Sequence, residues 1–499
     1  MELQFHKTGY PCLQRVKREV QNQEQTQEVR LGDGMPDIGR VLGAWGQVLL
    51  RGKEWRSGGM GVSGGVMVWV LYAPEDGGPV QCVDTWIPFQ MKWDFPDTER
   101  DGTICTACLL RNVDARSTSA RKLMVRASVG VLGEAMMPGE MALYMPDNLP
   151  ADVQVLKSTY PLRLPREAGE KPFVLEETLT LPGTAPDMEK LLRYELQPEI
   201  IDQKVMGGKV VFRGAAIVHI LYRGTDGMIY SWDFELPFSQ YSELDRDYDQ
   251  DATARIMPAV TSLELDTDEE GRLNLKAGLT GQYMISERTM AEVVEDAYSP
   301  RRSVTVRKES QQVPLILEEN SQTVHAEQSV EAEGSRVVDM AFYPDHARLL
   351  RSDQGIEAEL PGQFQMLYYD NEGVLQSAAP RWEGNWSLQA GDDTTVEAVV
   401  SASGRPQATL GGGKAEMRAD LLMQTTGTTQ QGIPMVTALE LGEMTEPDPN
   451  RPSLILCKIG EDRLWDVAKR TGSTVDAIRA ANRLTEEPNP MQVLLIPVS

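Results

Sequence analysis

The sequence predicts a mainly β protein, with three tandem β-rich repeat domains followed by a small α+β domain of strand–helix–helix–strand order. Three observations support this prediction. Short elements recur with a period of 150 residues, which marks two homologous domains, and a fainter third copy follows. Within each copy, apolar strand-like runs end at turns with Asp-Gly or Glu-Gly, which favour hairpins. Residues 453–499 instead show apolar residues at helical spacing.

The repeat is defined by short elements that recur at constant spacing, and a constant offset is typical of homologous domains. In the third copy, the strand Met366-Leu367-Tyr368 and the turn Asp370–Gly373 follow at an offset of 146. The pairs that recur between the first two copies are Pro36-Asp37 and Pro186-Asp187, Leu71-Tyr72 and Leu221-Tyr222, and Asp76-Gly77 and Asp226-Gly227.

Each copy is expected to contain a central strand, because apolar residues occupy both faces of Val66–Ala73, Ala215–Tyr222 and Phe364–Tyr369. The turn after each of these strands predicts a hairpin. A proline near the start of Pro36–Leu42 and of Pro186–Leu192 predicts a short helical turn there.

Domain boundaries follow from the repeat and from proline-rich stretches. The predicted β-rich repeats cover residues 1–150, 160–305 and 311–444, the last being the most divergent. A proline-rich linker at residues 445–452 then leads to the small domain at 453–499.

Composition excludes several classes of function. The formal net charge of −25 disfavours direct binding to nucleic acid or to an anionic lipid surface, because no region supplies a basic face. Five scattered cysteines favour a reducing compartment over a disulfide scaffold. No signal peptide and no membrane-spanning run is recognisable, so we expect a cytoplasmic protein without membrane insertion.

The small domain holds two helical patterns between two apolar runs of strand length. In the first helix, Leu464, Val467 and Ala468 share one face, with Trp465 at its margin as a core residue. Asp462 or Glu461 is expected to cap this helix. The second helix is expected to start at the cap Ser473, with Asp476 in the acidic N3 position, to end at Asn482, and to bury Val475, Ile478 and Ala481.

This segment resembles a LysM domain over nearly the whole family pattern. The matching residues are Gly460, Asp462, Leu464-Trp465, Val467-Ala468, Thr474-Val475, Ile478, Asn482, Leu484 and Leu494–Pro497. The resemblance implies a glycan groove between the loop before the first helix and the loop after the second. The groove candidates are Gly460, Glu461, Asp462, Arg463, Asn482, Arg483, Leu484, Thr485 and Glu486.

Departures from the LysM pattern fall at the groove and not in the core. An extra residue separates Gly460 from Asp462, Arg463 stands where a small hydroxyl residue is usual, and Met491 replaces the usual turn glycine. We therefore predict that the groove binds a protein partner, with glycan binding as the alternative.

No catalytic or metal-binding arrangement, and no cofactor site, is recognisable. Cys105 and Cys108 form a CxxC pair in a strand-like run, where side chains three apart point to opposite faces and cannot share a metal. The four histidines show no ligand spacing, and His219 is expected to be a hydrogen-bonded core residue. Gly411–Lys414 lacks the hydroxyl residue of a phosphate-binding loop and is expected to be a turn.

The whole chain resembles the SipL family of clostridial spore-coat morphogenetic proteins, which are SpoVID-like and combine tandem SPOCS-type domains with a C-terminal LysM domain. The resemblance implies a non-enzymatic scaffold in the mother-cell cytoplasm, placed at the forespore surface in the spore coat. It also implies binding to the coat basement ATPase SpoIVA, partly through the LysM-like domain. The alternative is a peptidoglycan- or glycan-binding protein associated with the cell wall.

Overall fold

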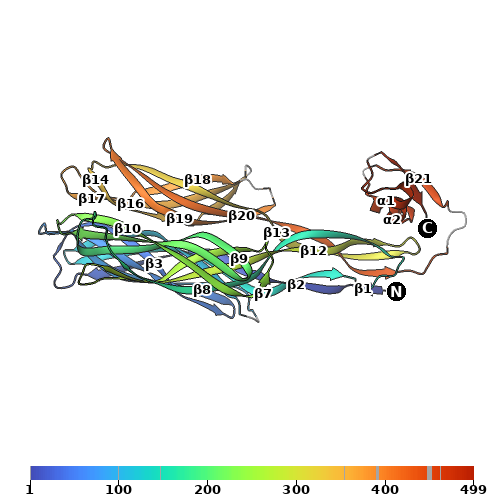
Figure 1. Cartoon of the computed structure of the whole chain (residues 1–499), viewed down its shortest axis with the longest axis horizontal. Coiled ribbons are helices and arrows are strands. Elements are labelled where there is room, and N and C mark those ends of the chain that lie inside the picture. Colours follow the sequence, from blue (N-terminus) through green and yellow to red (C-terminus); the bar gives the residue numbers. More distant parts are fainter. Residues whose placement is uncertain are drawn as a thin grey trace.

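The chain is described by a computed structural model. It describes residues 2–98, 101–146, 148–352, 355–388, 391, 393–446, 452–460, 462–489 and 491–498, without the side chains of residues 314–319. Strands dominate the chain, so the prediction of a mainly β fold is confirmed. Figure 1 shows an elongated molecule, with a wide body at one end, a narrow stalk at the other, and a small tail beside the end of the stalk.

The first part of the chain forms two three-stranded antiparallel sheets, ordered β2-β7-β6 and β3-β4-β5. We call strands β2 to β7 repeat 1. The short strand β1 (Glu2–Gln4) instead pairs with the last strand of repeat 3. The bounds are β2 (His6–Arg30), β3 (Ile38–Arg56), β4 (Gly59–Pro74), β5 (Gln81–Asp94), β6 (Thr103–Ser119) and β7 (Lys122–Met145).

Repeat 2, strands β8 to β12, has the same plan. One sheet is ordered β11-β12-β8 and the other pairs β10 with β9. Strand β9 turns at Gly207, whose φ is 60°. Its two halves take the place of β3 and β4, since Tyr222 near its end bonds back to Pro186 before its start. The bounds are β8 (Gln154–Leu179), β9 (Met188–Gly224), β10 (Ile229–Tyr248), β11 (Thr253–Thr267) and β12 (Leu273–Tyr298).

Repeat 3, strands β13 to β20, follows the plan again. Strands β13 and β19 both pair with β20, and β14, β15, β17 and β18 pair with β16. The bounds are β13 (Val304–Glu331), β14 (Arg336–Pro344), β15 (Arg348–Ser352), β16 (Gly355–Tyr369), β17 (Leu375–Ala378), β18 (Arg381–Leu388), β19 (Thr394–Gly411) and β20 (Lys414–Leu441).

The two recurring sequence elements of the repeat contact each other. The hydroxyl of Tyr72 donates to the carbonyl of Pro36 at 3.0 Å, and that of Tyr222 donates to Pro186 at 3.2 Å. The Pro-Asp element is an extended entry to a strand, so the prediction of a helical turn is wrong. Its backbone groups bond to other strands, as in the 3.0 Å bond from the Glu75 amide to the Asp37 carbonyl, which leaves no intrahelical ladder.

The predicted hairpins are present in all three repeats. Strand pairs β4–β5, β9–β10 and β16–β17 are antiparallel neighbours. Their turns place Gly77, Gly227 and Gly373 at φ values of 74°, 82° and 79°. A side chain is strained at such φ values, which explains why glycine recurs there.

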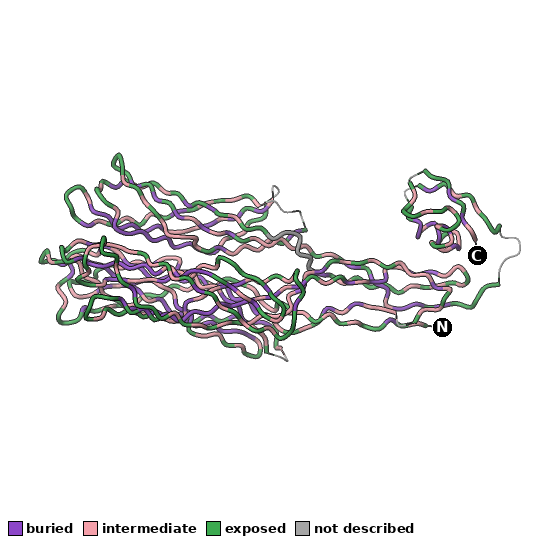
Figure 2. Tube along the Cα trace, in the orientation of Figure 1, coloured by how far each residue is buried: buried purple, intermediate pink, exposed green. Residues whose placement is uncertain are grey.

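Buried residues run through the body (Figure 2), and one hydrophobic cluster there, the shared core, contains residues of all three repeats. Polar contacts also connect repeat 1 to each of the other two repeats. Gln282 of repeat 2 exchanges hydrogen bonds of 2.9 and 2.8 Å with the backbone of Thr106 in repeat 1. Arg111 of repeat 1 bonds to Asp345 of repeat 3 at 2.7 Å. The shared core includes Trp45 and Leu71, Leu221 and Ile229, and Leu367 and Tyr369.

The stalk consists of one two-stranded ribbon from each repeat: β2–β7, β8–β12 and β13–β20. Each ribbon has a register shift at a matching place, between Arg15 and Lys17, between Ile285 and Ser286, and between Ile316 and Glu318. Such bulges bend a strand, and here they occur where the ribbons leave the body. The ribbons bury a core of Met141, Leu143, Leu162, Leu164, Ala291, Val293, Val313, Ile433 and Met435.

The tail has the predicted order of strand, helix, helix and strand, with β21 antiparallel to β22. Leu464, Val467 and Ala468 are buried as expected, and so is Trp465. The tail core is completed by Ile478, Leu494 and Ile496. The bounds are β21 (Leu454–Lys458), α1 (Leu464–Thr471), α2 (Val475–Asn482) and β22 (Val493–Pro497).

Both predicted helix caps differ from the structure. Thr474, not Ser473, caps α2, and its side chain accepts a bond of 3.1 Å from the Ala477 amide. Ser473 and Thr474 both carry a hydroxyl that could cap the helix. Thr474 is the residue directly before α2, and its backbone is extended. Arg463 precedes α1 without a side-chain cap, so Asp462 does not cap it, and Glu461 lies outside the described residues. Ala481, predicted to be buried, is exposed.

We predict that Gly227→Ala destabilises the chain by about 1–2 kcal/mol, because alanine is strained at a φ of 82° although space for its methyl group is open. Urea unfolding followed by circular dichroism would measure the change. Gly183→Ala is the matched control, since its site is equally open and its φ is not positive. Equal midpoints for the two variants would contradict the backbone argument.

Candidate functional site

The first loop of the predicted groove is exposed and charged. Gly460, Asp462 and Arg463 are all exposed. Asp462 accepts a bond of 3.0 Å from Arg470, and Arg463 donates one of 3.1 Å to Asp466. These pairs contribute little to stability because both partners of each are in contact with water. They give the loop fixed charges of both signs for a partner to contact.

The second loop is partly structural. The side chain of Asn482 braces β22: its amide nitrogen donates to the Leu495 carbonyl at 2.6 Å, and its oxygen accepts from the Leu495 amide at 2.8 Å. Arg483 ends α2 in the left-handed conformation, with a φ of 56°. Leu484 packs against the tail core. Only Thr485 and Glu486 are exposed without a structural contact of this kind.

The two loops meet at Glu487, a residue that the groove prediction omitted. One carboxylate oxygen accepts from the Leu464 amide at the start of α1 at 3.4 Å. The other accepts from Arg479 of α2 at 3.0 Å. Glu487 thereby replaces the missing cap of α1 and holds the second loop against the first.

Met491 has a φ of 74°, a strained value for a side chain other than glycine. It was identified above as a departure from the usual turn glycine. Its side chain is 62 % exposed. It lies just before β22, whose outer residues Val493 and Leu495 are also exposed.

The outer face of the tail sheet is apolar. Leu456 is 73 % exposed and lies opposite Leu495, while Leu454 and Val493 continue the same face. The inner face, with Cys457 and Leu494, packs on the helices. An apolar sheet face in water is typical of a surface that contacts another protein.

The tail also contacts the stalk, through two residues of β12 that sequence reasoning missed. Asp296 accepts bonds from Trp465 Nε1 at 3.0 Å and from Lys469 Nζ at 2.7 Å. The Tyr298 hydroxyl donates to the Ser473 carbonyl at 2.9 Å. The rings of Tyr298 and Trp465 meet edge to face, with their centroids 4.8 Å apart. Burial acts to raise the pKa of Asp296, but the bonds from Lys469 and Trp465 outweigh it and lower the pKa.

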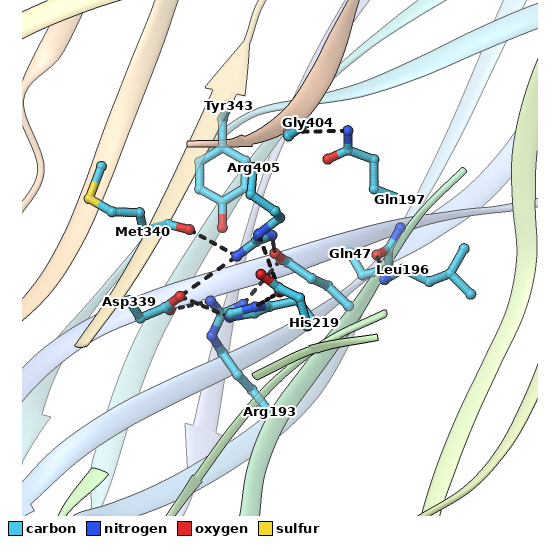
Figure 3. A network of polar contacts seen from close by, with 12 residues as sticks. Gln47, Arg193, Leu196, Gln197, His219, Asp339, Met340, Tyr343, Gly404 and Arg405 are labelled. Carbon is cyan, nitrogen blue, oxygen red and sulfur yellow. Dashed lines mark hydrogen bonds and ion pairs between the residues drawn. The ribbon is translucent and has the colours of Figure 1, made fainter. Parts of the chain in front are cut away.

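The body contains a buried charge network between repeats 2 and 3 (Figure 3). Arg193, which is fully buried, bonds to Asp339 and to Glu195. Arg405 bonds to Glu195, and its chain neighbour Gly404 receives a contact from Gln197. We call this group, with His219, the charge network.

His219 lies between two carboxylates, with Nδ1 2.5 Å from Asp233 and Nε2 2.8 Å from Asp339 of the charge network. It is buried and hydrogen-bonded, as predicted. Burial acts to raise the pKa of Glu195, but Arg193 and Arg405 lower it to about 2. A carboxylate that is ionised and fully paired in this way serves structure and is a poor proton carrier.

A cavity of about 310 Å³ lies where the three repeats meet. All three repeats line it: β3 and β6 from repeat 1, β9 and β11 from repeat 2, and β14, β19 and β20 from repeat 3. Two polar side chains on its wall have hydrogen-bond partners in another repeat. Gln47 accepts from the Leu196 amide at 3.0 Å, and the Tyr343 hydroxyl accepts from the Gly46 amide at 3.3 Å. These contacts connect the repeats across the cavity.

The two thiols of the CxxC pair are poorly suited to chemistry. Burial raises the pKa of Cys105 to about 11 and that of Cys108 to about 12, so both stay protonated at neutral pH. Within the described residues, no group of three or more His, Cys, Asp or Glu side chains is placed to hold a metal ion. In the same residues, no helix has the length and apolar character that crossing a bilayer requires.

We predict that Arg193→Met destabilises the chain by about 3–5 kcal/mol, because it leaves Asp339 buried without its main partner. Urea unfolding would measure the loss. Lys276→Met is the control, since Lys276 pairs with Glu176 on the surface and both side chains are over 60 % exposed. A similar midpoint for both variants would show that the buried pair is dispensable.

The lowered pKa of Glu195 predicts that the stability of the fold depends on pH. Its folded-state pKa of about 2 lies below the unfolded value of about 4.3. Its charge therefore stabilises the fold above the unfolded pKa, and this contribution is lost as the pH falls toward 2. Thermal unfolding between pH 6 and pH 3 is expected to depend less on pH in Glu195→Gln than in the exposed control Glu176→Gln. Parallel profiles would contradict the assignment.

Comparison with known proteins gives one match. The family model described as SipL, SPOCS domain matches residues 187–267, which contain β9, β10 and β11 of repeat 2. No curated protein and no solved structure matches the chain. The matched segment begins at the Asp of the recurring Pro-Asp element and includes the Leu-Tyr element that contacts it. The match supports a SipL-like assignment and a role related to sporulation.

Proposed function

We propose that the chain is a non-enzymatic spore-coat morphogenetic scaffold. It acts in the mother-cell cytoplasm at the forespore surface, and it docks there by binding a SpoIVA-like coat protein, partly through the LysM-like tail. The observation that carries the proposal is the SipL SPOCS match to repeat 2, the strand plan of which recurs in repeats 1 and 3.

The arrangement of the body supports a scaffold. Its buried charges are used to connect repeats, as in the contact of Arg193 with Asp339. The three repeats share a core and therefore present their outer surfaces in fixed relative positions. A rigid set of repeated surfaces suits multivalent recruitment, because a second contact on the same partner becomes intramolecular.

The tail supports a protein partner in preference to a glycan. Its only aromatic side chain, Trp465, packs against the stalk, and neither groove loop carries an aromatic ring on which a sugar could stack. The first loop presents charged pairs at Asp462 and Arg463. The outer sheet face adds apolar area around Leu456. Apolar area and charged groups both occur in protein interfaces.

We predict that Arg463→Glu and Leu456→Glu, each in the full chain, weaken binding to a purified SpoIVA-like protein about ten-fold, the equivalent of 1.4 kcal/mol. Both residues are exposed, so folding is expected to be unchanged. Surface plasmon resonance measures the affinity. Val174→Glu is the matched control, an exposed apolar residue of β8 in the body.

Two outcomes would overturn this proposal. One is unchanged affinity in both tail variants. The other is retention of the full chain on insoluble peptidoglycan at micromolar strength, which would favour the cell-wall alternative. A fluorescent fusion in a sporulating host tests the location, with a ring around the forespore as the expected image. Diffuse fluorescence would contradict the proposed docking.

A further inference from the structure

The contact between tail and stalk is centred on one carboxylate. Asp296 Oδ2 accepts from both Trp465 and Lys469 of α1, and Oδ1 lies 3.2 Å from Lys308 of β13. Its side chain is only 15 % exposed. Asp296 therefore joins the tail to the ribbons of repeats 2 and 3 at the same point. A charge-assisted hydrogen bond of this kind fixes the relative position of the two groups in addition to attracting them.

Tyr298 forms the second half of the contact. Its ring belongs to the same hydrophobic cluster as the tail core, and Leu156 of β8 packs beside it. Its hydroxyl bonds to the Ser473 carbonyl at the turn between α1 and α2. Burial raises the pKa of Tyr298 to about 12, so this hydroxyl keeps its proton as a donor at neutral pH.

The tail has a core made mainly of its own residues. Leu464, Val467, Ile478, Leu494 and Ile496 are all 1 % exposed or less, and they come from both helices and β22. Trp465 directs its ring and its Nε1 at stalk residues, and Lys469 also bonds to Asp296. Separation of tail from stalk would thus expose Trp465 and Tyr298 and leave the tail fold intact. These are the properties of two bodies held by a small interface.

The stalk covers the α1 side of the tail. Arg463, in the first groove loop, lies two residues before Trp465, and the pKa of its guanidinium is raised by Asp466 first and further by Glu295 and Asp296 of the stalk. The docked stalk therefore places negative charge beside this loop. The outer sheet face around Leu456 stays exposed in the docked state.

We propose that Asp296 and Tyr298 form a latch, an intramolecular docking surface on the stalk for the tail of the same chain. When the latch is closed, it covers the side of α1 that carries Trp465 and Lys469, while the Arg463 side chain stays exposed. When it opens, that side becomes available to the partner protein. The docking itself is independent of the proposed function, whereas the control of partner access rests on it.

The latch is tested in the full chain with the double variant Asp296→Asn, Tyr298→Phe. Both changes keep size and shape while removing the charge and the hydroxyl donor. Glu292→Gln is the control, an exposed residue of the same strand that pairs with Lys157 at 2.8 Å. NMR relaxation of the Ile478 and Ile496 methyl groups measures how fast the tail tumbles. The spread of their chemical shifts shows whether the tail is folded.

In the wild type, these methyl groups are expected to relax at the rate of a 55.4 kDa particle. In the double variant, their transverse relaxation is expected to slow several-fold, as in a small domain on a tether. Tail methyl groups that tumble freely in the wild type, or slowly in the variant, would overturn the latch. Relaxation that depends on protein concentration, with dimers in light scattering, would instead assign the contact to two chains and also overturn it.

Partner affinity tests the regulatory step separately. If the latch is closed nine-tenths of the time, opening it is expected to raise affinity for the SpoIVA-like protein about ten-fold. Freed methyl groups with unchanged affinity would overturn the control of access and leave the docking in place. If the wild type and the variant both fail to bind, the proposed function is wrong, and the relaxation data alone decide on the latch.

Discussion

The buried contact between Arg193 of repeat 2 and Asp339 of repeat 3 is the constraint on which the body depends. Both side chains are fully buried, so neither charge has water as an alternative partner. Removing two charges from water is unfavourable unless their geometry is well matched. The pair therefore admits one arrangement of the two repeats and excludes sliding between them. The ring of Trp45 in repeat 1 lies 5.2 Å from the same guanidinium and so adds repeat 1 to this contact.

Local features of the fold could be predicted from the sequence, and long-range ones could not. The glycine turns at Gly77, Gly227 and Gly373 follow from backbone sterics within a few residues. The Pro-Asp segments were predicted to be helical because the partner hydroxyls of Tyr72 and Tyr222 lie 36 residues away. The side-by-side packing of repeats depends on contacts such as Arg111 with Asp345, which local pattern does not reveal.

The tail shows the same division. The buried face of α1 follows from spacing at Leu464, Val467 and Ala468, and the structure bears it out. The groove candidates divide into exposed residues and structural ones, and Asn482 is structural because its side chain satisfies the edge of β22. Trp465 is buried as predicted, but its indole bonds to Asp296, 169 residues earlier in the chain. No helical periodicity reports such a partner.

The long ribbon of β20 has a mechanical consequence. The chain leaves β20 at the tip of the stalk on its way to the tail, and β20 lies between β1 and β13 there. A force on the tail directed away from the body pulls β20 along its own axis. Its hydrogen bonds to both neighbours then bear the load together, in shear, instead of opening one after another. This strand arrangement therefore resists a force that pulls the tail away from the body.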